Sequence, residues 1–144
     1  MSPCPIHHRL RSIMFALEVR DHIMIGHSLP SEVFGPAQGL HGATFTVDAA
    51  FYAEDIDEHG LVVDIGLASQ ALSEVLEPLR YQNLDEVPQF KGKFTTTEFL
   101  CRHIFDGLAE RIRAGSVGDQ GRVKKVRIML HESHVARAWF EGVI

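Results

Sequence analysis

Apolar and polar residues alternate along two early segments of the chain, residues 13–27 and 41–53. Successive side chains of a strand point to opposite faces, so this period of two predicts two strands, each with one buried face. Asp21 and His22 interrupt the first alternation, and we expect a β-bulge there. The acidic segment 54–60, which ends in glycine, is expected to form the turn after the second strand.

The middle of the chain has helical spacings instead. Asp64 suits the start of a first helix, and Pro78 brings that helix to its end. Thr95 and Glu98 are spaced as a capping box at the start of a second helix. Each helix has one apolar face, made of residues three or four positions apart: Leu67, Ala68, Ala71, Leu72, Val75, Leu76 and Leu79 in the first, and Leu100, Ile104, Leu108 and Ile112 in the second.

Two further segments, residues 123–132 and 134–141, predict the last two strands. The order is therefore strand, strand, helix, helix, strand, strand. It predicts an α+β fold in which two helices cover one face of a four-stranded antiparallel sheet, a stable two-layer arrangement. We expect residues 13–144 to form a single domain, preceded by a flexible N-terminal arm, residues 1–12.

The composition is that of an ordinary globular protein, because 45% of the 144 residues are hydrophobic and 23% are charged. A net charge of −5 argues against nucleic-acid binding through phosphate neutralisation. The sequence shows no apolar leader and no long apolar run, so we expect a cytoplasmic protein without a membrane partner. Two cysteines, Cys4 and Cys101, are too few for a disulfide framework.

Two histidines extend apolar strand faces. By alternation, His27 shares a face with Ile23 and Ile25, and His41 shares a face with Phe45 and Val47. A neutral imidazole binds metal well where water is partly excluded, so both are candidate metal ligands. A hydrogen-bonded core histidine is the alternative, and it is the commoner situation for a histidine taken alone.

Glu132 falls on the apolar face of the segment 123–132. An unpaired carboxylate there would be unfavourable, so we expect a group with paired hydrogen-bond donors to meet it. A glutamate turned to solvent at the strand end is the alternative. Thr96 and Thr97 lie at a helix start, where backbone N–H groups and hydroxyls can bind the polar edge of a ligand.

Five short motifs occur in the order and spacing of one known family, over about residues 22–140. They are His27-Ser28-Leu29-Pro30, Leu40-His41-Gly42, Gly60-Leu61-Val62-Val63-Asp64, Thr96-Thr97-Glu98 and His131-Glu132-Ser133. On these motifs the chain resembles the 6-pyruvoyl-/6-carboxy-tetrahydropterin synthase family. The resemblance implies a T-fold whose subunits join edge to edge into barrel-shaped homo-oligomers. It also implies a pterin-like ligand, lyase chemistry and zinc as cofactor.

The binding residues of that family carry over in part. The resemblance implies that Glu132 anchors the pterin and that Thr96 and Thr97 hold its ring. It also implies that His27 and His41 are two of three zinc ligands.

The third zinc histidine of the family is replaced by Ala43, which leaves a zinc centre an open question. His22, His103 or another subunit could supply a substitute, and the sequence selects none of them.

The family's catalytic cysteine is replaced by Ala37, and its Asp-His pair by Arg80 and Tyr81. The catalytic residues therefore stay unassigned. One interpretation is a pterin-binding, lyase-type enzyme that acts on a dihydropterin-like substrate with altered catalytic residues. The other is a non-catalytic pterin-binding or assembly module that keeps the T-fold.

Overall fold

The structure is a computed structural model and describes residues 14–144. Its sheet has four antiparallel strands in the order β1-β2-β3-β4. The strands are β1 (Phe15–His27), β2 (His41–Ala53), β3 (Val123–His131) and β4 (Arg137–Val143). The strands follow one another across the sheet in the same order as along the chain. The predicted four-stranded antiparallel sheet is confirmed.

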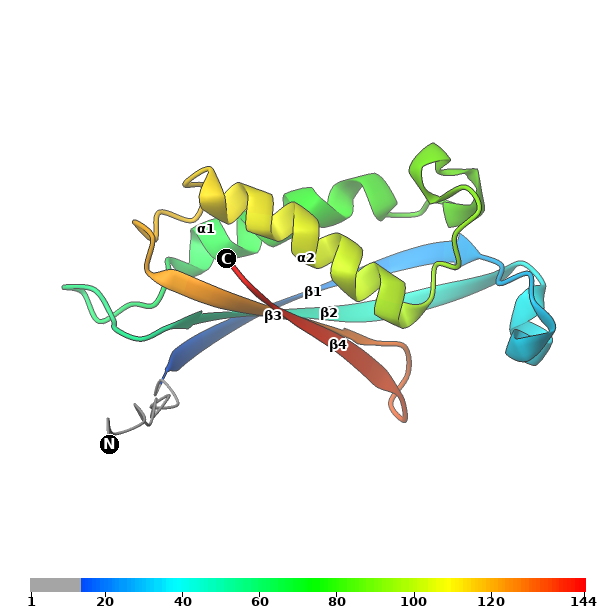
Figure 1. The fold of residues 1–144 in the computed structure, drawn as a ribbon, viewed down its shortest axis with the longest axis horizontal. Coiled ribbons are helices and arrows are strands. Elements are labelled where there is room, and N and C mark those ends of the chain that lie inside the picture. The colour runs from blue at the N-terminus through cyan, green and yellow to red at the C-terminus, as the bar shows by residue number, and fades with distance from the viewer. Residues whose placement is uncertain (1–13) are drawn as a thin grey trace, which may run out of the picture.

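Two α-helices, α1 (Ile65–Leu76) and α2 (Thr97–Arg113), lie on the same face of this sheet. Figure 1 shows them side by side above the strands, and within residues 14–144 no α-helix covers the opposite face. The predicted α+β, two-layer T-fold is confirmed. Short 3-10 helices occupy the connections at Glu32–Gln38, Glu77–Leu79, Leu84–Glu86 and Pro88–Phe90.

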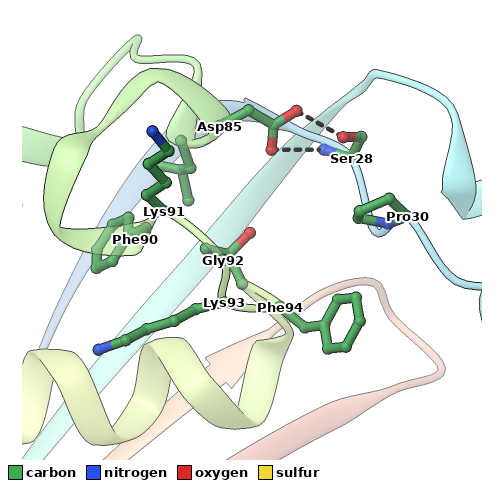
Figure 2. Close-up of a pocket in the computed structure, with 10 residues that line it drawn as sticks. Ser28, Pro30, Asp85, Phe90, Lys91, Gly92, Lys93 and Phe94 are labelled. Carbon is green, nitrogen blue, oxygen red and sulfur yellow. Dashed lines mark hydrogen bonds between the residues drawn. The ribbon is translucent and has the colours of Figure 1, made fainter.

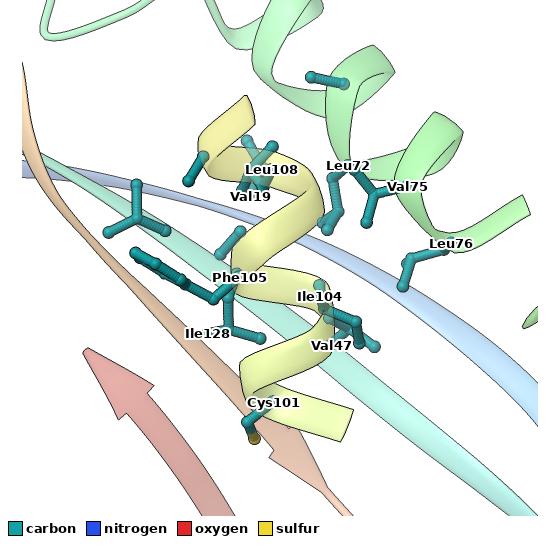
Figure 3. Close-up of a cluster of buried hydrophobic side chains, with 14 of the residues drawn as sticks. Val19, Val47, Leu72, Val75, Leu76, Cys101, Ile104, Phe105, Leu108 and Ile128 are labelled. Atoms are coloured by element: carbon teal, nitrogen blue, oxygen red, sulfur yellow. The ribbon is translucent and has the colours of Figure 1, made fainter. Parts of the chain in front are cut away.

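The hydrophobic core lies between the helices and the sheet, as Figure 3 shows. The apolar face predicted for each helix is buried there, with the exception of Leu67 in the first turn of α1, which is 41% exposed. Ile104 and Leu108 of α2 are fully buried, as are Val47 of β2 and Ile128 of β3. Cys101 is buried in the same core and hydrogen-bonds to the Ala138 carbonyl.

The predicted β-bulge at Asp21 is wrong. The pairing of β1 with β2 runs without a shift from Phe15 opposite Ala53 to His27 opposite His41. Asp21 keeps its place on the helix-facing side because Arg80 meets its carboxylate there, with 2.7 Å between the charged atoms. A half-buried carboxylate partnered in this way needs no bulge to turn it outward.

Several predicted boundaries were also displaced. Strand β3 ends one residue before Glu132, and β4 runs from Arg137 rather than from residue 134. The cap of α2 is Thr96, whose hydroxyl accepts a hydrogen bond from the Phe99 backbone N–H. The Thr95 capping box was wrong because the Thr95 side chain lies beside a histidine ring instead.

The predicted arm, residues 1–12, lies outside the described residues. Within residues 14–144, none of the helices has both the length and the apolar character needed to cross a bilayer.

Candidate functional site

Two histidines from adjacent strands meet at one end of the sheet. His27 is the last residue of β1 and lies directly opposite His41, the first residue of β2. Their ring centroids are 4.6 Å apart, and the rings meet edge to face. Alternation places both side chains on the same face of the sheet, and the register of β1 with β2 brings them into contact.

The bonding of His27 fixes which ring nitrogen is free. Its Nδ1 lies 3.0 Å from the Thr95 carbonyl oxygen and 3.1 Å from the Thr95 hydroxyl. A carbonyl oxygen only accepts hydrogen bonds, so a neutral His27 carries its proton on Nδ1. The lone pair is then on Nε2, which is buried and has no hydrogen-bond partner within the described residues. This orphaned acceptor needs a donor or a metal ion.

His41 is held in the same manner. Its Nδ1 lies 2.8 Å from the Gly39 carbonyl oxygen, so the neutral ring presents Nε2 as its lone-pair nitrogen. A backbone carbonyl bonded to the non-ligating nitrogen is the usual support of a metal-binding histidine. Both rings are therefore oriented as metal ligands would be.

Burial is the main cause that lowers the pKa of His27, and the neighbouring His41 lowers it further. The Thr95 carbonyl and the carboxylates of Asp85 and Glu132 act in the opposite direction. A lowered pKa keeps the imidazole neutral near pH 7, which is the form that binds metal.

A third ligand is missing from the part of the chain that the structure describes, where no group of three His, Cys, Asp or Glu side chains is placed to hold a metal. Ala43 follows His41 on the same strand face and offers no donor atom. His22 is exposed on the opposite face, and His103 on α2 packs edge-on against Phe90, with 4.8 Å between the ring centroids. Neither of these histidines completes the site, so the residues present fit only half of a zinc centre.

Glu132 and Thr97 form the polar pair that the sequence predicted for ligand binding. The Thr97 hydroxyl donates to Oε2 of Glu132 at 3.3 Å and connects the start of α2 with the end of β3. Glu132 is exposed because it lies just past the strand end, so the expectation of a buried carboxylate was wrong. The Thr96 hydroxyl is engaged in capping α2, whereas the Glu132 carboxylate keeps further lone pairs for a ligand.

A cavity of about 360 Å³ lies next to Thr95, the hydrogen-bond partner of His27, although neither histidine lines it. Figure 2 shows Asp85 on one wall, where its carboxylate accepts hydrogen bonds from the Ser28 backbone N–H at 3.0 Å and from the Ser28 hydroxyl at 2.6 Å. Thr95, which bonds to His27, lines the same cavity, and Phe90 and Pro30 add apolar surface. Sequence reasoning missed Asp85, because nothing in the irregular segment around it distinguishes one acid from another.

The resemblance assigns the family's catalytic positions to Ala37, Arg80 and Tyr81. None of these three residues lies in the cavity that Thr95 and Asp85 line. Ala37 lies in a 3-10 helix, and its carbonyl accepts from the Leu29 backbone N–H at 3.1 Å. Arg80 bonds to Asp21 and to the His22 carbonyl oxygen. Tyr81 is 81% exposed. The only described cysteine, Cys101, is no substitute, because burial raises the pKa of its thiol to about 11.

A second polar cluster, also missed, lies on the sheet face without helices. Asp48 of β2 is almost fully buried there, and both of its oxygens bond to Arg20 of β1, at 2.6 and 2.9 Å. Nε2 of His131 lies 2.7 Å from the same carboxylate. The sequence showed each of these residues on the polar side of its strand, but only the register brings the three together.

Comparison with known proteins gives matches over nearly the whole chain. The family described as 6-pyruvoyl tetrahydropterin synthase matches residues 16–143. A curated relative, 6-carboxy-5,6,7,8-tetrahydropterin synthase of Bacillus subtilis (strain 168), is 23% identical over 95 residues. That region is 65% of this chain and 65% of the relative, so the chain spans about two thirds of the relative's length.

Solved structures show the same fold. The 6-pyruvoyl tetrahydropterin synthase of Caenorhabditis elegans superposes with a TM-score of 0.74 at 23% identity, covering 90% of this chain and 96% of that one. The synthase of Plasmodium vivax gives a TM-score of 0.72 at 16% identity, covering 92% and 99%. The chain belongs to the 6-pyruvoyl tetrahydropterin synthase family.

Proposed function

We propose that this chain is a pterin-binding enzyme that acts by lyase-type chemistry on a dihydropterin-like substrate, with catalytic residues that differ from those of its family. The observation that carries the proposal is the Thr97–Glu132 hydrogen bond at the start of α2, two residues after Thr95, which bonds to the His27 ring. The names of the matched synthases supply the ligand class.

In this proposal Glu132 anchors the ligand. A pterin presents a ring N–H and an exocyclic amine side by side, and a carboxylate can accept from both. Thr97 orients Glu132 through its hydroxyl, and Thr96 holds the helix start in place by capping it. His27 and His41 lie near the reacting part of the ligand, and each neutral ring presents Nε2 as its lone-pair nitrogen.

Titration of neopterin tests this proposal. Charge-assisted hydrogen bonds are worth about 1.5–3 kcal/mol each, so we expect Glu132→Gln to weaken binding by about 30- to 1000-fold. Thr97→Ala should weaken it less, because backbone N–H groups at the helix start remain. Glu98→Gln is the matched control on α2 and should leave the affinity unchanged. Equal affinities for wild type and Glu132→Gln would remove Glu132 from the site.

The second candidate function is a non-catalytic pterin-binding or oligomeric assembly module, and one observation favours it. Arg80 stands where the family has a catalytic acid, and here it holds β1 through Asp21 and the His22 carbonyl. Incubation with dihydroneopterin triphosphate and 7,8-dihydroneopterin, followed by product analysis, separates the two. Binding without any product would favour the module, and an altered side chain would support the enzyme.

A further inference from the structure

We propose that the turn between β3 and β4 holds a binding site for a small tetrahedral oxyanion, a phosphate or sulfate group, on the sheet face opposite α1 and α2. The side chains of His131 and Arg137 would bind the anion, with Ser133 and His134 beside them. This site is separate from the proposed pterin site and does not rest on the proposed function.

The first argument is a small polar cavity at the turn, of about 250 Å³. It has room for one oxyanion and several waters, since a water takes about 30 Å³. His131, His134 and Arg137 line it with groups that carry or can take up a positive charge, and Ser133 adds a hydroxyl. No acidic residue of the described chain lines it. The carboxylate of neighbouring Glu132 accepts a hydrogen bond from α2, on the other side of the sheet.

The second argument comes from the register of the two strands. His131 and Arg137 lie directly opposite each other in the pairing of β3 with β4. Side chains at such positions share a face and have Cβ atoms about 4.5–5.5 Å apart, so two cations there repel each other unless a negative group joins them. Arg137 is exposed, and the planar fork of a guanidinium matches two oxygens of one oxyanion.

The third argument is that Asp48 prepares His131 for this role. Asp48 is only 3% exposed, and its carboxylate lies 2.7 Å from Nε2 of His131. That bond orients the ring and keeps a proton on Nε2, so Nδ1 is the nitrogen left for a ligand. A second proton turns Nδ1 into a donor. Arg20 already balances the charge of Asp48, with bonds at 2.6 and 2.9 Å, so protonation of His131 gives the cluster a net positive charge.

Proton uptake by His131 should therefore accompany anion binding. The titratable and charged side chains around it on this face come from both neighbouring strands, from β1 and from the turn: Asp48, Arg137, Arg20, His22 and His134. Asp48 is the one carboxylate among these five, and Arg20 shares it. A bound oxyanion would supply the second negative charge, and we expect it to bind more tightly at lower pH.

Titration of sulfate into the full chain, followed by calorimetry at constant ionic strength, tests the site. Sulfate keeps its charge between pH 6 and pH 8, so a change in affinity over this range reports on the protein. We expect saturable binding at one site per chain, tighter at pH 6 than at pH 8. Arg137→Gln should weaken it by about 10- to 100-fold. His131→Gln should also weaken it and should remove most of the pH dependence.

Lys125→Gln is the matched control. Lys125 is a cation on the same face of the same strand, about 20 Å from His131 along β3, so this variant should bind sulfate as the wild type does. Arg137→Lys keeps the charge without the planar fork and should lose less affinity than Arg137→Gln. A melting temperature recorded for each variant shows that it is folded, and His131→Gln provides the same test if Arg137→Gln does not fold.

Two further titrations identify the source of the anion. Inorganic phosphate and glycerol 3-phosphate carry the same group, free in one case and esterified in the other. Tighter binding of the ester would assign the site to the phosphate group of an organic ligand, and tighter binding of inorganic phosphate would assign it to the free ion. Either result would support the site.

Three outcomes would overturn the inference. The first is the absence of saturable sulfate binding by the folded wild type at pH 6. The second is equal affinity in the wild type and in a folded Arg137→Gln variant. The third is an equal response to chloride, which would show general screening of charge. None of these results bears on the neopterin titration, so the proposed function stands or falls separately.

Discussion

At the scale of single residues, Arg80 has a structural role. Its guanidinium bonds to the Asp21 carboxylate at 2.7 Å and to the His22 carbonyl at 2.6 Å, and only 20% of the side chain is exposed. Charge-assisted hydrogen bonds in such a setting stabilise a fold. We expect Arg80→Met to lower the free energy of unfolding by about 1–3 kcal/mol, measured by urea denaturation.

The control for this prediction is Arg102→Met. Arg102 pairs with Asp106 on the surface of α2, where both side chains are more than half exposed, so its loss should change stability by less than about 0.5 kcal/mol. Equal effects of the two substitutions would show that the Arg80–Asp21 pair contributes no more than a surface ion pair.

Asp48 gives a prediction about acid stability. The hydrogen bond from Arg20 is the main cause that lowers the pKa of Asp48, and His131 adds to it while burial opposes it. Because the folded pKa is lower, the unfolded chain takes up the proton first as the pH falls. The stabilisation is therefore complete above the unfolded pKa of about 3.9 and is lost as the pH falls toward the folded value.

We expect Asp48→Asn to destabilise the fold by about 1–3 kcal/mol near pH 6, because Arg20 and His131 lose a charged acceptor. The difference from wild type should shrink below about pH 4, where the Asp48 carboxyl group of the unfolded wild-type chain takes up a proton while the folded form still holds its charge. Urea denaturation at several pH values measures it. A difference that stayed constant down to pH 2.5 would contradict the assignment of this stabilisation to the Asp48 charge.

The site was predictable from the sequence only where strand alternation determines it. His27 and His41 were expected on one face, and the structure brings their rings together, because a period of two is a local property. Asp85 lies 57 residues from Ser28, its hydrogen-bond partner. No local pattern indicates such a contact, so it could not be found from the sequence.

At the scale of elements, the apolar periods predicted both helices and all four strands, whereas their ends were less accurate. The end of a helix or strand depends on single hydrogen bonds. Thr95 satisfies the sequence pattern of a cap, but His27 from a distant strand occupies it, and the cap moves to Thr96. The sequence does not show this competition.

The packing of α2 against β4 depends on one glycine. A Cβ added to Gly142 would lie 2.3–2.8 Å from three ring atoms of Phe105, which is too close for any real contact. Phe105 also packs against Phe140, so its ring has little room to move. We expect Gly142→Ala to lower the free energy of unfolding by about 1–3 kcal/mol through overpacking.

Two variants test that explanation. Phe105→Leu should reduce the cost of Gly142→Ala when the two are combined, because it removes the ring atoms that clash. Gly39→Ala is the control, since its added Cβ would meet nothing within 4 Å. Thermal or urea denaturation of the four proteins gives the coupling. Simple additivity of the Gly142 and Phe105 substitutions would show that the clash is not the cause.

At the scale of the whole molecule, the edge of strand β1 is covered over only part of its length. The segment after α1 bonds to its outer side, with Tyr81 N–H donating to the Met24 carbonyl and Gly26 N–H donating to the Gln82 carbonyl. Since backbone groups alternate along a strand, the even-numbered residues of β1 face outward. Within residues 14–144, no hydrogen bond outside the β1–β2 pairing involves the backbone of Glu18.

An exposed edge of this kind invites pairing with another chain. We therefore expect a homo-oligomer in which this part of β1 adds to the sheet of a neighbouring copy. Glu18→Pro tests it, because proline removes one outward N–H and is tolerated on an edge strand. The variant should keep its melting transition but sediment as a smaller species, whereas Glu18→Ala should sediment as wild type. An unchanged sedimentation coefficient for a folded Glu18→Pro variant would exclude this edge from the interface, and a monomeric wild type would exclude the oligomer itself.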